Sequence, residues 1–68
     1  MHIGNLIKEQ VKKQERTVVW LAEQLACSRT NIYKIYERPS IDTGLLLRIS
    51  VLLDYDFFSL YSKMVEDK

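Results

Sequence analysis

Five side chains with strong hydrogen-bonding capacity fall within six consecutive positions of this 68-residue chain. They are Arg29, Thr30, Asn31, Tyr33 and Lys34. On a helix, Ile32 and Ile35 would point inward while Thr30 and Lys34 point nearly the opposite way. Arginine and lysine pair with guanine O6 and N7, asparagine pairs with adenine, and threonine or tyrosine contacts phosphates or thymine methyl groups. The spacing therefore predicts a helical face whose chemistry suits the base edges of double-stranded DNA.

Two short helices and a tight turn are expected to position this face. Thr17 and Ser28 are good N-cap residues, so the sequence predicts one helix directly after Thr17 and another over residues 29–37. The connection between them is the segment 26–28. An inward stripe on the first of these helices is formed by Leu21, Ala22 and Leu25.

Three further helices are expected around this pair. Residues 3–14 follow the rhythm of an amphipathic helix. After Pro39, Ser40 is expected to cap a fourth helix with Asp42 in its first turn, followed by a broad apolar stripe. Asp56 is expected to cap a short final helix, and the segment 65–68 is expected to fray. Within the fourth helix Gly44 lowers the helix propensity. The only reason we expect for a glycine there is close packing near the helix start.

Composition excludes several classes of function. The chain has one cysteine and one histidine, so it can form no internal disulfide, and Cys27 and His2 have no metal-ligand spacing. No nucleophile stands beside a base, and no glycine-rich phosphate loop is present, so we expect neither an enzyme nor a cofactor nor a small-molecule ligand. The first residues lack the apolar core of a signal peptide and no segment is long enough to span a membrane, which predicts a cytoplasmic protein with no membrane partner.

The charge is unevenly distributed although the net charge is only +1. Up to Arg38 the chain carries seven basic and four acidic residues, a balance of +3. The remainder carries three basic and five acidic residues, a balance of −2. The positive half is the half that contains the predicted helix pair, which favours a polyanionic partner there, although two ordinary solvated surfaces remain the alternative.

Several aromatic side chains are candidates for a dimer or partner surface. Trp20 lies off the inward stripe of its helix, so it either lies against the C-terminal segment or meets another molecule. Near the C-terminus not all the aromatic residues can be buried in so small a domain. The candidate surface consists of Trp20, Phe57, Phe58 and Tyr61.

The segment TVVWLAEQLACSRTNIYKIY, residues 17–36, resembles the helix-turn-helix of XRE-like phage repressor and Cro proteins. The positions that match in register are Leu21, Ala22, Leu25, Ser28, Ile32 and Ile35. The resemblance implies an all-α, compact five-helix, lambda-repressor-like domain with its helix-turn-helix at the second and third helices. It also implies that Arg29, Thr30, Asn31, Tyr33 and Lys34 face base edges, with Thr17 and Ser28 near phosphates.

Two positions depart from the family pattern. Ala26 replaces the turn glycine, which predicts a slightly different turn, because glycine adopts the left-handed conformation at little cost. Val18 replaces a common glutamine, which removes a usual phosphate contact. The basic residues Lys13, Arg16 and Arg38 are expected to contact phosphates around the helix pair.

The sequence thus predicts a sequence-specific DNA-binding domain over residues 1–62 with a frayed tail over 63–68. We expect a transcriptional regulator that places the helix 29–37 in the major groove and binds as a homodimer, because one such helix reads only a few base pairs. The alternative is a protein-interaction module, such as an antitoxin-like or adaptor domain, that keeps this helical shell. It would use Trp20, Tyr33, Tyr36 and the Phe57–Phe58 region against a protein.

Overall fold

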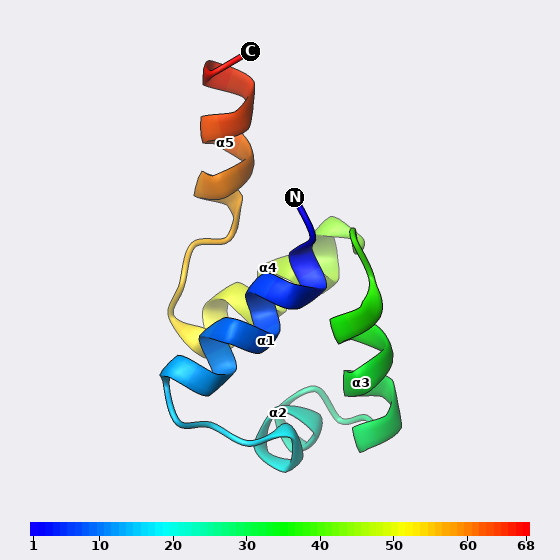
Figure 1. The fold of residues 1–68 in the computed structure, drawn as a ribbon. Helices are drawn as coiled ribbons and strands as arrows, with labels where there is room; N and C mark the ends of the chain where they lie inside the picture. Colours follow the sequence, from blue (N-terminus) through cyan, green and yellow to red (C-terminus); the bar gives the residue numbers. More distant parts are fainter.

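The computed structural model describes all residues, 1–68, as five helices without a strand, which confirms the predicted all-α class. The helices are α1 (Ile3–Lys13), α2 (Val18–Gln24), α3 (Arg29–Glu37), α4 (Thr43–Leu53) and α5 (Phe58–Glu66). Helices α1 to α4 pack together, whereas α5 stands away from them (Figure 1) and contains no buried residue. The molecule is consequently elongated, measuring 37 × 20 × 19 Å.

The predicted caps of the central helix pair are confirmed. Thr17 Oγ1 accepts a hydrogen bond from the Trp20 amide at 3.0 Å, at the start of α2. Ser28 Oγ accepts one from the Asn31 amide at 3.2 Å, at the start of α3. Each hydroxyl satisfies an amide that has no partner within its helix, so both helix starts are fixed by local sequence.

The start of α4 differs from the prediction. Asp42, not Ser40, is the N-cap, and its Oδ1 accepts from the Leu45 amide at 3.1 Å. Because Ser40 and Asp42 are both capping residue types, the choice depends on where the chain leaves the α3 end, and a carboxylate additionally favours the positive end of the helix dipole. At α5 the residue directly before the helix is Phe57, which makes no capping hydrogen bond, but Asp56 one position earlier does accept from the Ser59 amide through its Oδ1 at 3.2 Å.

Three helices end at a non-glycine residue in the left-handed conformation. These residues are Glu15, Ala26 and Asp54, with φ angles of 57°, 53° and 49°. At the α2 end the Cys27 amide donates to the Ala22 carbonyl at 2.9 Å and the Ala26 amide donates to the Glu23 carbonyl at 3.2 Å. This pair of hydrogen bonds is that of a Schellman cap. Ala26 therefore takes up the left-handed conformation itself, despite its Cβ.

A single apolar core lies between the first four helices and extends to the residue before α5. Ile7, Leu21, Ile32 and Ile49 are fully buried, so each of these four helices contributes a central side chain. The core consists of Ile3, Ile7, Val11, Leu21, Ala22, Leu25, Ile32, Ile35, Tyr36, Leu46, Ile49, Leu53 and Phe57.

The start of α1 meets the end of α3 through backbone atoms. The amides of Ile3 and Gly4 donate to the carbonyls of Pro39 and Arg38 at 3.0 and 2.9 Å. A Cβ at Gly4 would overlap the carbonyl oxygens of Ile35 and Tyr36. Glycine is therefore the residue that lets α1 approach α3 closely enough to make these hydrogen bonds.

One expectation for the second half of the chain is wrong, that of close packing at Gly44. Gly44 is exposed. A Cβ added to it would have only one near neighbour, Oδ1 of the N-cap residue Asp42, at 3.1 Å. Close packing therefore does not explain this glycine. The tail expected from residue 63 continues as α5 to Glu66, although the side chains over 62–68 are all exposed.

The two glycines predict opposite effects of the same substitution. Gly4→Ala should destabilise the fold by about 1–3 kcal/mol, because α1 must move away from the α3 carbonyls. Gly44→Ala should be neutral or stabilising by up to about 1 kcal/mol, because alanine favours the helix and the Asp42 carboxylate can shift. Urea unfolding followed by circular dichroism measures both, and equal effects of the two substitutions would contradict the close contact at Gly4.

The left-handed turn between α2 and α3 gives a second test. Ala26→Gly should stabilise the fold by up to about 1 kcal/mol. Glycine removes the cost of the left-handed conformation, about 1–2 kcal/mol, and this gain exceeds the entropy that glycine loses on folding. Ala26→Val should destabilise it, because a β-branched residue is disfavoured at positive φ. Thermal unfolding of the two variants should move in opposite directions, and a destabilised Ala26→Gly would contradict the conformation described.

Candidate nucleic-acid interface

Helix α3 separates its side chains between a buried and an exposed face, as the sequence predicts. Ile32 and Ile35 are 0% and 6% exposed, and Tyr36, expected on the flank, is also buried. The five predicted base-contacting residues are all exposed, and we call them the polar face of α3: Arg29, Thr30, Asn31, Tyr33 and Lys34. Because the isoleucines anchor α3 in the core, the polar face is held outward by packing of its own helix.

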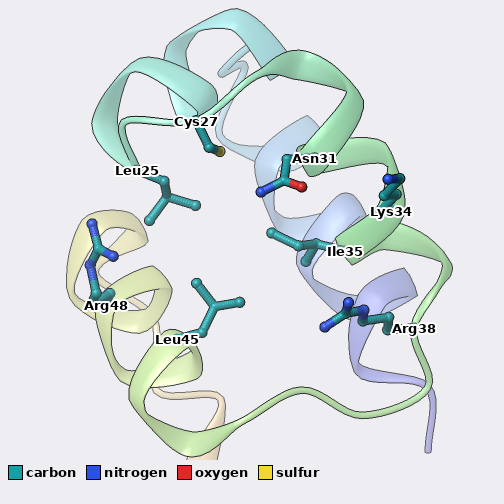
Figure 2. A pocket seen from close by; sticks show the side chains of 8 residues that line it. All are labelled: Leu25, Cys27, Asn31, Lys34, Ile35, Arg38, Leu45 and Arg48. Atoms are coloured by element: carbon teal, nitrogen blue, oxygen red, sulfur yellow. The ribbon is translucent and has the colours of Figure 1, made fainter.

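A cleft of 190 Å³ lies between α3 and α4. It brings Asn31 and Lys34, at one edge of the polar face, near Arg48 of α4, which is far from them in sequence. Its cationic and polar lining consists of Asn31, Lys34, Arg38 and Arg48, and its apolar lining of Leu25, Cys27, Ile35 and Leu45. In Figure 2, Leu25, Ile35 and Leu45 point toward one another across the cleft, with Arg38 and Arg48 on opposite sides. We call this site the basic cleft.

The basic cleft is electrostatically one-sided. Lys34, Arg38 and Arg48 line it together with the Asn31 amide, and no acidic side chain contributes to its lining. Guanidinium groups donate several hydrogen bonds to a phosphate or carboxylate, and the low-dielectric wall formed by the leucines strengthens the attraction. The arrangement is suited to an anion, and a backbone phosphate of DNA has the required chemistry.

A second hollow borders the opposite edge of the polar face, toward α1, and its charge is mixed. Tyr33 lines it together with Lys8 and Glu37. The Tyr33 ring meets the Tyr36 ring edge-on, with centroids 6.4 Å apart. His2 spans α1 and α3 there, since its Nδ1 accepts from the Asn5 amide at 3.1 Å and its Nε2 lies 3.2 Å from the Glu37 carbonyl oxygen.

The predicted phosphate-contacting residues do not form one group. Only Arg38 lines the basic cleft. The hydroxyls of Thr17 and Ser28 accept from helix amides, which leaves each hydroxyl hydrogen free to donate outward. Lys13 is exposed at the end of α1, and the Arg16 guanidinium carbon lies 4.5 Å from the centroid of the Trp20 ring.

The structure removes one of the four residues from the predicted aromatic partner surface and separates Trp20 from the others. Phe57 is 0% exposed and belongs to the core, where its ring packs edge-on against Tyr55 at 4.7 Å. Phe58, Tyr61 and Trp20 are half-buried. Helix α5 lies at the opposite end of the molecule from α2 (Figure 1) and does not cover Trp20, which packs instead against the core and beneath Arg16.

Sequence reasoning missed Arg48 because no local pattern marks it. A single arginine beside the apolar stripe of α4 has the pattern of an ordinary solvated residue, and only the position of α4 across the cleft from α3 brings it to the basic cleft. The exposed apolar residues Leu47 and Val51 were missed for a related reason. They stand outside the predicted apolar stripe of α4, but the sequence does not show whether another part of the chain covers them, and the structure leaves them exposed.

No family model, curated protein or solved structure matches this chain. The structure contains no group of three or more His, Cys, Asp or Glu side chains placed to hold a metal ion. None of its helices has both the length and the apolar character needed to cross a bilayer.

Tyr36, on the buried side of α3, has a shifted pKa. Burial raises the pKa of the Tyr36 phenol above its ordinary value of 10.0, and the neighbouring Tyr33 raises it further when charged. The folded state thus favours the neutral phenol. Its contribution to stability is fully present below pH 10 and is lost as the pH rises through the raised pKa.

Tyr36→Phe tests this burial. The tyrosinate absorbance of the folded wild-type protein should include a late step above pH 10 that the variant lacks. The free energy of unfolding of the wild type should also fall relative to that of Tyr36→Phe over the same pH range. In Tyr33→Phe the late step should remain, because burial is the larger cause of the raised pKa of Tyr36, but it should move to lower pH because the charge of Tyr33 is removed. A late step that survives Tyr36→Phe would contradict the assignment.

Proposed function

We propose that this protein binds double-stranded DNA sequence-specifically, as a transcriptional regulator, by placing α3 in the major groove. The observation that carries the proposal is the burial of Ile32 and Ile35 opposite the polar face of α3. A nine-residue helix of this kind, presented by a preceding short helix and a tight turn, is the geometry of helix-turn-helix readers. Such readers contact base edges from the first turns of this helix, which supports base contacts by the exposed Arg29, Thr30 and Lys34.

The helix order supports a lambda-repressor-like arrangement. Helices α2 and α3 are the candidate helix-turn-helix, both capped by hydroxyl side chains and joined by the left-handed Ala26. The sequence of this segment resembles that of XRE-like phage repressor and Cro proteins, in which the turn position is commonly glycine. The left-handed φ of 53° at Ala26 supports an equivalent turn in this chain.

The basic cleft would contribute affinity rather than sequence preference. Phosphate contacts position a protein on the duplex and carry no direct sequence information. Arg38 and Arg48 approach the cleft from its two sides, so a backbone phosphate entering it would be held between α3 and α4. Lys34 belongs both to the polar face and to the cleft, and it would link base readout to phosphate contact.

Duplex binding tests this function. With a sequence recovered by selection from a random DNA pool, Arg29→Ala and Lys34→Ala should each cost about 1–3 kcal/mol of specific affinity. Arg48→Ala should weaken binding to all duplexes and lower the salt dependence by about one counterion. Lys63→Ala on α5 is the matched control, because it removes one exposed charge away from α3, and it should change specific affinity little.

Fluorescence anisotropy at salt concentrations between about 50 and 200 mM measures these effects. Specific binding that is indifferent to Arg29 and Lys34 would contradict the assignment of α3. Absence of duplex binding at low salt would instead favour the protein-interaction module. That alternative is weakened by the burial of Phe57 and Tyr36, which were part of the aromatic surface it requires.

A further inference from the structure

The only histidine of the chain bridges two helices. His2 is the N-cap of α1, where its Nδ1 accepts from the Asn5 amide at 3.1 Å. Its Nε2 lies 3.2 Å from the carbonyl oxygen of Glu37, the last residue of α3. One half-buried side chain therefore contacts the start of α1 and the end of α3 at the same time.

These two contacts fix the protonation state of the ring. A backbone amide can only donate, so Nδ1 of His2 carries no hydrogen when it accepts from Asn5. A backbone carbonyl can only accept, so Nε2 carries the hydrogen and donates it to Glu37. A neutral imidazole has one donor and one acceptor, and this ring uses both. The bridge is therefore specific to the neutral tautomer with hydrogen on Nε2.

The histidine completes a junction that is otherwise made by backbone atoms. The last carbonyls of a helix have no partner within that helix. Here the carbonyls of Arg38 and Pro39 accept from the amides of Gly4 and Ile3 at 2.9 and 3.0 Å, and the preceding carbonyl accepts from His2. Three consecutive residues at the start of α1 thus satisfy three consecutive carbonyls at the end of α3.

A proton on the ring breaks one of its two contacts. An imidazolium has a donor on each nitrogen and no acceptor, so Nδ1 can no longer accept from the Asn5 amide. The positive end of the α1 dipole also disfavours a cation at this N-cap. The hydrogen bond from Nε2 to Glu37 persists, because the negative end of the α3 dipole favours a cation. Protonation therefore leaves His2 in contact with α3 alone.

The charges around His2 come from both helices. The titratable side chains that line its hollow are Lys8 of α1 and Tyr33, Tyr36 and Glu37 of α3. A phenol stays neutral in the pH range in which histidines titrate, so Lys8 and Glu37 are the charged pair, one of each sign. The amino group of Met1 is a further cation one residue away. A variant that changes only His2 keeps all these groups, so it isolates the effect of the ring.

We infer that His2 is a positioning residue that joins α1 to the end of α3 only while its ring is neutral, which makes this junction sensitive to protons. Histidine is the side chain that changes charge between about pH 5 and 8. Above this range His2 holds both helices, and below it α1 loses its cap. Because α3 carries the polar face, the inference deepens the proposed function and in this respect rests on it.

The tautomer is tested first, on the wild-type protein without DNA. Long-range correlation of the ring protons with the ring nitrogens at about pH 8, where histidine side chains are neutral, distinguishes the two tautomers. The expected spectrum is that of hydrogen on Nε2, with Nδ1 unprotonated. A spectrum with hydrogen on Nδ1, or averaged between the two tautomers, would overturn the inference because the Asn5 amide would then lack its acceptor.

Solvent exchange of the Asn5 amide tests the sensitivity to protons. After correction for the intrinsic rate at each pH, its protection in the wild type should fall about fivefold between about pH 8 and 5, the contribution of a typical N-cap. His2→Asn keeps a capping side chain that takes up no proton, so protection should be the same at both pH values. His2→Ala should give low protection at both.

The Asn31 amide is the internal control. It donates to the Ser28 hydroxyl at 3.2 Å in the same capping geometry, but its acceptor does not titrate, so its corrected protection should not change with pH. Circular dichroism establishes that both His2 variants remain folded. Asn5 protection that is independent of pH in the wild type, or that falls equally in His2→Asn, would overturn the inference. Either result can occur while duplex binding through α3 persists, so it is distinguishable from failure of the proposed function.

Discussion

The orientation of α3 depends on the contact between the backbone of Gly4 and the last turn of α3. Two amides at the start of α1 donate to the carbonyls of Arg38 and Pro39, and this is possible only because no side chain separates the two helices. At its other end α3 is fixed by the left-handed turn at Ala26 and by the Ser28 cap. A helix held at both ends through backbone geometry, with Ile32 buried between them, presents its polar face rigidly.

Local features of the structure could be predicted from sequence. The caps Thr17 and Ser28 and the inward isoleucines of α3 depend on residue type and helical period, and they occur where expected. Features that depend on the path of the chain could not. Ser40 and Asp42 are both capping residue types, and the path of the chain after Pro39, together with the more favourable carboxylate, selects Asp42.

The same limit applies to burial and to close approach. The aromatic cluster at the start of α5 offers several residues for the core, and tertiary packing selects Phe57. A glycine in a predicted helix lowers the helix propensity, but the sequence does not show whether a close neighbour requires the glycine. Close packing was expected at Gly44, which is exposed, whereas the close approach occurs at Gly4. Arg48 reaches the basic cleft only because α4 lies across the cleft from α3, so its place in the candidate site had no local signal.

Helix α4 contributes both to the core and to the candidate site. Its inner side supplies Leu46, Ile49 and Leu53 to the core, and its edge carries Arg48 to the basic cleft. The proposed phosphate contact therefore depends on the same helix that completes the core.

The central claim is that the polar face of α3 contacts DNA, and amide chemical-shift mapping by NMR during titration with a selected duplex tests it most directly. The predicted result is a set of shifted amides concentrated over residues 28–38 and around Arg48, with the α5 amides unchanged. Shifts confined to α5 or to the outer side of α1, with the residues of α3 unaffected, would contradict the claim.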